Sequence, residues 1–139
     1  ANNHGMYLTD TTVIYLTNDE ISPMALCALL NSEIMDFRFH YLTKLKGGGV
    51  KEYFAKQIER LPVPFNSKNV ADIKHLGELG EKRTSLTSSL DTTQIEKERQ
   101  SLLLDIQEID GKIEKLVAKL FGLSDLEYET IIETKRKWS

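Results

Sequence analysis

Cysteine is almost missing from this chain of 139 residues, which contains only Cys27. A single cysteine cannot form an internal disulfide, and this favours a reducing compartment such as the cytoplasm. Because Cys27 lies among Ala and Leu residues without a catalytic motif, we expect a buried small hydrophobe and not a nucleophile. No apolar run approaches the roughly 20 residues that span a bilayer, and the polar N-terminus is unlike a signal peptide. The sequence therefore predicts a cytoplasmic protein with no membrane partner.

Residue patterns for metal and nucleotide binding are also missing. The three histidines lie far apart in the sequence and no cysteine pair accompanies them, so we expect no metal site. The run Gly47–Gly49 lacks the Lys-Ser/Thr pair of a phosphate-binding loop. Asp125 with Glu133-Thr134-Lys135 imitates the acidic set of a magnesium-dependent nuclease, but such triplets are frequent in charged helices. We interpret this triplet as the tail of a helix.

The chain has no overall excess of positive charge, since its net charge is −3. This net charge argues against a general nucleic-acid binder. One window differs from this average. Residues 38–60 contain only two acidic residues, Glu52 and Glu59, and half of their six positive residues flank the triple glycine. The positive residues of this window are Arg38, Lys44, Lys46, Lys51, Lys56 and Arg60.

The N-terminal half of the sequence predicts a mixture of strands and helices. A β-branched run at residues 11–16 is typical of a strand. Ser22-Pro23 favours a helix start, and apolar residues then recur at three- and four-residue steps to about Lys44, which predicts one core helix. Phe37, Phe39 and Tyr41 alternate at its end, so at least one ring should leave the buried stripe. After the glycines we expect a short strand at 50–54 and a helical turn at 55–60, ended by two prolines.

Residues 66–139 contain no proline, and this C-terminal half predicts an antiparallel helical hairpin. Residues 89–92 are expected to form its turn, and Thr93-Gln94-Ile95-Glu96 resembles a capping box. Gly122 should end the second helix, and Ser124–Glu127 should cap a short third one. The second helix carries a heptad seam of Ile95, Leu102, Ile106, Ile109, Ile113, Leu116 and Leu120, while the first carries a weaker seam of Ile73, Leu76, Gly80, Arg83, Thr87 and Leu90.

These elements predict an α+β fold: a small globule with few strands around one core helix, followed by a long, coiled-coil-like hairpin. We expect the domain boundary near residue 65, with segments 1–65 and 66–139. The polar N-terminus and the unpaired strand indicate a fragment of a longer protein. The surplus apolar face of the second helix would dock the globule, the rest of the protein or a second copy, which motivates a homodimer hypothesis.

The stretch 29–64 resembles the TaqI-like C-terminal specificity domain of adenine-specific DNA methyltransferases and type IIG restriction-modification enzymes. In that family a Leu-Asn-Ser helix is followed by a Gly-Gly turn, an aromatic and basic strand, and a Lys-Gln-aliphatic run that ends in Leu-Pro-aliphatic-Pro. The matching residues are Leu29, Leu30, Asn31, Ser32, Lys56, Gln57, Ile58, Leu61, Pro62, Val63 and Pro64. A second likeness, at residues 109–131, follows the family's Ile-Asp and Leu-aromatic-Gly-Leu-Ser/Thr pattern.

The resemblance implies a DNA-recognition module that binds double-stranded DNA beside an upstream methyltransferase domain. The chain lacks the Asn/Asp-Pro-Pro-aromatic motif and the cofactor loop of a methyltransferase, so S-adenosylmethionine, and magnesium if the parent also cuts DNA, would belong to the parent enzyme. The fragment itself would be no enzyme and would hold no cofactor. A helical protein-interaction or dimerisation module without DNA contact is the alternative.

The candidate DNA-binding residues come from the basic window. Lysines beside the glycines would contact phosphates, because glycine lets the backbone approach DNA closely. The planar side chains of arginine and glutamine suit base edges, and a tyrosine there would stack or donate a hydrogen bond. An ordinary surface loop is the competing interpretation. The candidate residues are Arg38, Lys44, Lys46, Gly47, Gly48, Gly49, Lys51, Tyr53, Lys56 and Gln57.

Overall fold

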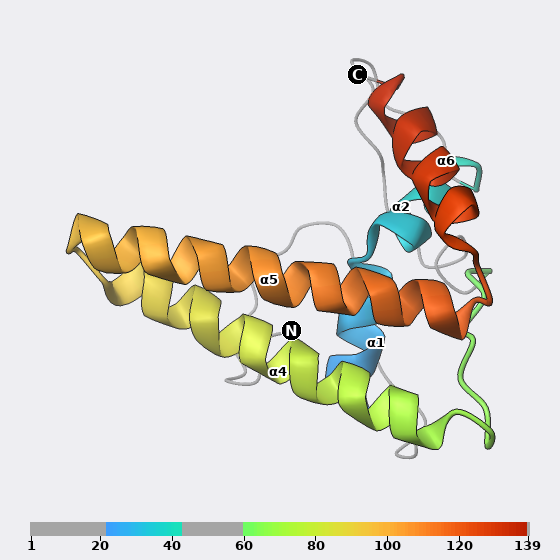
Figure 1. The fold of residues 1–139 in the computed structure, drawn as a ribbon. Coiled ribbons are helices and arrows are strands. Elements are labelled where there is room, and N and C mark those ends of the chain that lie inside the picture. The colour runs from blue at the N-terminus through green and yellow to red at the C-terminus, as the bar shows by residue number, and fades with distance from the viewer. Residues whose placement is uncertain (1–21, 43–59, 139) are drawn as a thin grey trace.

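The computed structural model describes residues 22–42 and 60–138. Two long helices form an antiparallel hairpin, a short helix crosses one end of it, and two further helices lie side by side at that same end (Figure 1). The helices are α1 (Pro23–Leu30), α2 (Glu33–His40), α4 (Val70–Thr92), α5 (Glu96–Leu120) and α6 (Asp125–Arg136). The hairpin consists of α4 and α5, the crossing helix is α1, and α2 and α6 are the neighbouring pair.

The predicted α+β class is wrong, because residues 22–42 and 60–138 contain helices and no strand. This part of the protein is all-α. The strands predicted at 11–16 and 50–54 lie outside the described residues, as does the turn at 55–60 apart from Arg60. The apolar spacing identified the helices, while the short β-branched runs carried the strand prediction.

The single core helix predicted from Pro23 to Lys44 is also wrong, because the chain breaks at Asn31 and Ser32 into α1 and α2. The Ser32 hydroxyl donates to the carbonyl oxygen of Leu29 at 2.7 Å and accepts from the backbone N–H of Met35 at 3.3 Å. It thereby closes one helix and caps the next. The side-chain Nδ2 of Asn31 donates to the Cys27 carbonyl at 2.8 Å, and the backbone N–H of Asn31 donates to the same carbonyl at 3.1 Å.

Close packing of α1 on α4 depends on two glycines in α4. A Cβ atom at Gly80 would lie 2.8 Å from the carbonyl oxygen of Met24, and one at Gly77 would lie 3.0 Å from Ser22 Oγ. The sequence predicted only that this helix carries the weaker seam. The structure shows that the two glycines let the backbone of α1 approach α4 closely.

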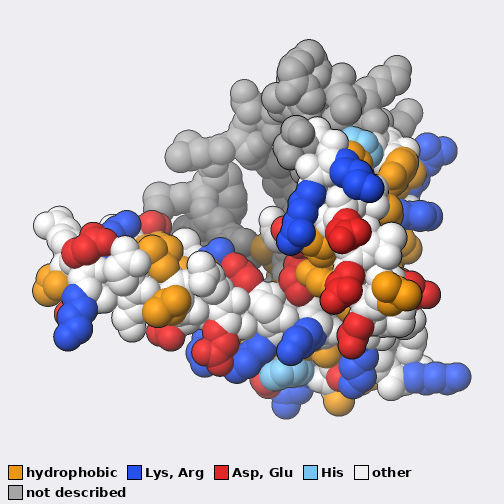
Figure 2. Space-filling view, turned by 45° about the horizontal axis from the view of Figure 1, so that its top comes forward, with side chains coloured by type: hydrophobic (Ala, Val, Ile, Leu, Met, Phe, Trp, Pro, Cys, Tyr) orange, Lys and Arg blue, Asp and Glu red, His pale blue; other side chains and the backbone are white. Residues whose placement is uncertain are grey.

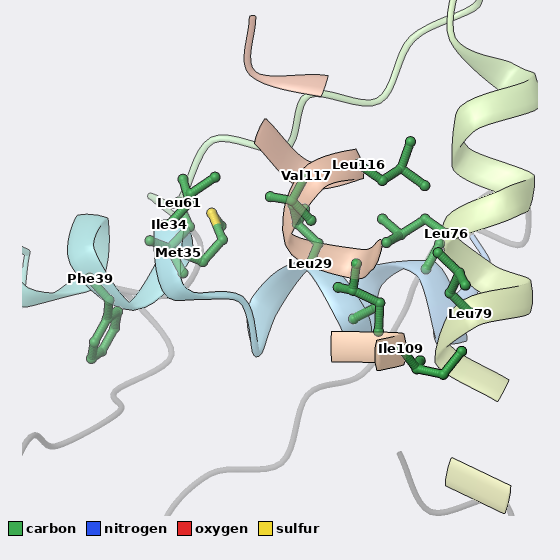
Figure 3. Packing of buried hydrophobic residues seen from close by; sticks show 13 residues of the cluster. Leu29, Ile34, Met35, Phe39, Leu61, Leu76, Leu79, Ile109, Leu116 and Val117 are labelled. Carbon is green, nitrogen blue, oxygen red and sulfur yellow. The ribbon is translucent and has the colours of Figure 1, made fainter. Parts of the chain in front are cut away.

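One hydrophobic core joins α1, α2, α4 and α5. Leu29 of α1 is buried and points toward Leu76 of α4 and toward Ile109 and Val117 of α5 (Figure 3). The core draws on residues from both predicted segments, and the boundary near residue 65 stays a prediction. None of the helices in the described ranges is long and apolar enough to cross a membrane.

The predicted hairpin is confirmed, but its turn lies later than expected. Helix α4 continues through residues 89–92 and ends at Thr92, so the turn is formed by residues 93–95. The capping box predicted at Thr93–Glu96 is wrong, since Ile95 occupies the N-cap of α5 and no side chain caps it. Arg99 of α5 stabilises the turn instead, because its Nη1 donates to the carbonyl oxygens of Leu90 at 2.8 Å and Thr93 at 3.0 Å.

The predictions for the end of the hairpin are confirmed. Gly122 has φ +69°, the left-handed conformation that favours glycine after a helix. Ser124 and Glu127 form the predicted capping box, in which each side chain accepts the other's backbone N–H at 3.2 and 2.9 Å. This tight turn directs α6 away from α5 and toward α2 (Figure 1).

Candidate nucleic-acid interface

Most of the basic window, residues 43–59, lies outside the described residues, and we call this part the basic segment; the residues on both sides of it are described. Leu42, which follows α2, packs against the hydrophobic core, and Leu61 is buried within that core. Figure 3 shows Leu61 beside Ile34 and Met35 of α2. The described residues on both sides of this segment, Leu42 and Leu61, are therefore parts of one hydrophobic core.

Arg38 is the one candidate residue within the described ranges. It lies in the last turn of α2, and its side chain is exposed to solvent. The outward position of Arg38 is compatible with a contact to DNA. The remaining candidates lie outside the described residues: Lys44, Lys46, Gly47, Gly48, Gly49, Lys51, Tyr53, Lys56 and Gln57.

The alternating aromatic residues at the end of α2 point in different directions. Phe39 is only 2% exposed and belongs to the core, while Tyr41 is 63% exposed. The prediction that at least one ring leaves the buried stripe is confirmed. An exposed tyrosine therefore stands at the end of α2, three residues before Lys44.

Helix α6 holds α2 in place through an ion-pair cluster. The Nζ atom of Lys135 lies 2.7 Å from Asp36 Oδ2 and also contacts the Glu33 carboxylate. Burial of Lys135 lowers its pKa, but the hydrogen bonds to Asp36 and Glu33 outweigh this effect, so the pKa rises above its ordinary value. Lys135 therefore stays charged at neutral pH, and its positive charge offsets the acidic start of α2.

A half-buried carboxylate on α5 caps the same helix. Glu114 accepts a hydrogen bond from the backbone N–H of Glu33 at 2.9 Å and another from the Tyr128 hydroxyl at 3.3 Å. Burial raises the pKa of Glu114, and the negative charge of Glu33 adds to that increase, while the N–H of Glu33 opposes it. Burial, followed by the charge of Glu114, raises the pKa of Tyr128 to about 12. The start of α2 is thus held from two other helices.

The sequence analysis missed an aromatic cluster at the end of α2, which we define as Phe37, His40, Tyr41 and Trp138. Trp138 follows α6 and stacks on His40, with ring centroids 3.7 Å apart. One available signal was that the only tryptophan of the chain follows three successive basic residues. Nothing local in the sequence connects that tryptophan with residues almost a hundred positions earlier.

A cleft of about 430 Å³ lies among α1, α4 and α5. Its lining includes Cys27, the ion pair between Arg83 and Asp110 at 2.7 Å, and Glu114. Carboxylates outnumber cations there, so the cleft lacks the positive excess of a phosphate site. In the part of the chain that the structure describes, no three His, Cys, Asp or Glu side chains are grouped as metal ligands.

Residues 1–63 match the family model of the TaqI-like C-terminal specificity domain. The predicted resemblance is therefore confirmed for this N-terminal part of the chain. Domains of this family are DNA-recognition modules of restriction-modification enzymes. No curated protein and no solved structure is detectably similar to the chain. The likeness noted at residues 109–131 lies beyond the match and stays a prediction.

Proposed function

We propose that this chain binds double-stranded DNA as the target-recognition module of an adenine-specific DNA methyltransferase. The observation that carries the proposal is the family match over residues 1–63, which contains the whole basic segment. The catalytic domain would lie upstream in the same polypeptide and would bind S-adenosylmethionine. Magnesium would be needed only if the parent enzyme also carries a nuclease.

The ends of the basic segment support this proposal. Leu42 packs against the hydrophobic core and Leu61 is buried within it, so the folded core holds the residues on both sides of these lysines. Lys44, Lys46 and Lys51 would contact phosphates on both sides of the three glycines, with Arg38 and Gln57 directed to base edges and Tyr53 stacking. Lys56 would add a further phosphate contact.

The direct test is the salt dependence of DNA binding. Fluorescence anisotropy with randomised double-stranded oligonucleotides would compare the wild type with the triple variant Lys44→Ala/Lys46→Ala/Lys51→Ala. Each phosphate contact contributes about 0.9 to the slope of log affinity against log salt, so losing three should flatten it by about 2.7. Selection from the same pool would then identify the preferred site.

A matched control removes the same charge elsewhere. Lys74, Lys82 and Lys97 are exposed on the hairpin, and their triple alanine variant should keep the wild-type slope. Equal slopes for all three proteins would contradict DNA contact by the basic segment. Equal losses in both triple variants would indicate a general effect of net charge and not a site.

A protein-docking function is the second candidate, because the tip of the hairpin exposes apolar side chains. Leu104 is 65% exposed, and Ile95 and Leu103 are exposed as well. The predicted docking seam is not available along its whole length, since Ile106, Ile109, Ile113 and Leu116 are buried within the molecule. Docking would therefore use the tip, either for the upstream domain or for a second copy.

Light scattering across a range of concentrations tests the homodimer. A mass above one chain that falls to one chain in Leu104→Glu would support dimerisation through the tip. Such an apolar contact should change little with salt, whereas DNA binding should weaken steeply. A mass of one chain at every concentration would contradict the dimer.

A further inference from the structure

The last turn of α6 and the last turn of α2 meet through the aromatic cluster, although almost a hundred residues separate them. The Trp138 ring is nearly parallel to His40, at 11°, and to Phe37, at 10° with centroids 5.7 Å apart. Tyr41 meets the Trp138 ring edge-on, at 77° with centroids 6.2 Å apart. It also packs edge-on against Phe37 at 5.3 Å. The four rings thus fix the position of the C-terminal turn.

Tyr41 remains mostly exposed in spite of these ring contacts. Burial of a large ring is normally favourable, and the Tyr41 ring already makes T-shaped contacts with Phe37, His40 and Trp138. Its position is therefore set before any partner arrives, so a partner that packs on it meets little ordering cost. Aromatic rings presented in this way suit the flat, apolar surfaces of bases and sugars.

Positive charge accompanies this ring. Lys135 pairs with Glu33 and Asp36, and Arg136 and Lys137 continue the same turn with exposed basic side chains. In Figure 2, Lys and Arg side chains gather at the upper right of the described surface, at the end of the molecule where α6 lies. The aromatic cluster is therefore flanked by cations, which is the combination that nucleic acids require.

We propose that the C-terminal turn of α6 and the aromatic cluster form a second DNA contact, in which Tyr41 packs on a sugar or base and Arg136 and Lys137 bind phosphates. This inference rests on the proposed function and extends it to a helix outside the family match. The chain geometry allows both contacts on one duplex. Tyr41 precedes Lys44 by three residues, which span at most about 11 Å, the length of about three nucleotides along one strand.

The chain contains one tryptophan, so its fluorescence reports on this site alone. Titration of the wild type with double-stranded DNA should quench Trp138 emission with the same midpoint as the anisotropy change. The double variant Arg136→Ala/Lys137→Ala should flatten the salt slope by about 1.8, because two phosphate contacts are lost. Tyr41→Ala should weaken binding roughly tenfold without changing the slope, because stacking carries no charge. Tyr41→Phe keeps the ring and should bind like the wild type.

Control measurements distinguish a loss of folded structure from a loss of DNA contact. An unchanged melting temperature in the free variants shows that α6 is still docked, and unperturbed Trp138 emission adds to this for Tyr41→Phe and Arg136→Ala/Lys137→Ala, which keep the ring at position 41. The charge-matched variant Lys82→Ala/Lys97→Ala on the hairpin should keep the wild-type slope. A purely structural role for Arg136 and Lys137 at the C-terminus of a helix would alter the melting temperature and leave the slope unchanged.

The two proposals fail in different ways. If the variant of Lys44, Lys46 and Lys51 loses affinity while the Tyr41 and α6 variants bind like the wild type, only the second contact is overturned. DNA binding that saturates without any change in Trp138 emission overturns it as well. If the wild-type chain does not bind DNA, the proposed function and this inference are overturned together.

Discussion

The two halves of the hairpin share the same helices but differ in how they are stabilised. In the inner half, residues 70–83 and 106–120, the seam of α5 is buried, and Leu76 of α4 is fully enclosed. In the outer half, residues 84–105, Leu103 and Leu104 are exposed, and Arg99 closes the turn through backbone carbonyls. The inner half packs against α1, whereas the outer half extends beyond it (Figure 1). A heptad seam therefore predicts that two helices pair, but burial of the seam depends on a third helix.

The largest expected effect contrasts one leucine from each half. Leu76→Ala should lower the free energy of unfolding by about 2–5 kcal/mol, because it leaves a cavity where α1, α4 and α5 meet. Leu104→Ala removes the same atoms from the exposed tip and should change it by less than about 0.5 kcal/mol. Urea unfolding of both variants measures the difference. Equal losses would mean that the outer half is as tightly packed as the inner half.

Alanine substitutions at two glycines should change the stability of the protein in opposite directions, which sharpens the comparison. Gly80→Ala places a Cβ atom against the carbonyl oxygen of Met24, so α1 must shift and stability should fall by about 1–3 kcal/mol. Gly111→Ala in α5 meets open space and should raise stability by roughly 0.5–1 kcal/mol, because alanine favours the helix. Thermal unfolding monitors both variants. A gain in both would contradict the close contact between α1 and α4.

Two serine caps differ in burial, so replacing each with alanine should lower the free energy of unfolding by different amounts. Ser32→Ala removes an acceptor for the Met35 N–H and a donor to Leu29 inside the core, so it should cost about 1–2 kcal/mol. Ser124→Ala acts at an exposed cap, where water replaces the lost partner, and should cost about 0.5–1 kcal/mol. Denaturant unfolding compares the two variants. A larger cost for Ser124 would show that docking of α6 limits stability more than the junction of α1 and α2.

The smallest expected effect depends on pH. The folded-state pKa of Glu114 is raised mainly by burial, so its favourable contribution is present below the unfolded value of 4.5 and is lost as pH rises through the folded pKa. Glu114→Gln keeps an acceptor for the Glu33 N–H without the buried charge. The variant should therefore match or exceed wild-type stability at neutral pH, and this advantage should disappear in acid. Thermal unfolding across that pH range tests the sign, and an advantage that grows in acid would contradict it.

The sequence features that predicted the structure correctly are local ones. The capping box at Ser124–Glu127 and the glycine at position 122 involve residues within one turn, so their chemistry is visible in the sequence. The break between α1 and α2 was missed because apolar spacing continues across it. Asn31 and Ser32 are tolerated within helices, and only the buried site of Ser32 favours the cap.

The candidate site also contains features that the sequence predicted and features that only the structure revealed. Arg38 and the exposed ring at the end of α2 follow from position and spacing along one helix. The contribution of α6 does not, because Trp138 and Lys135 reach α2 through contacts across the fold. The terminal triplet was correctly assigned to a helix tail, but its role in fixing α2 was not foreseen.

The sequence by itself determined the family of residues 1–63, the pairing of α4 with α5, and the end of α5, because each rests on neighbouring residues or on a regular spacing. The tertiary structure alone decided which half of the hairpin is buried, why α4 carries Gly77 and Gly80, and where α6 docks. These features depend on atoms brought within a few ångströms by packing of distant segments. Periodicity predicts which face of a helix is apolar, but only the assembled core decides what covers that face.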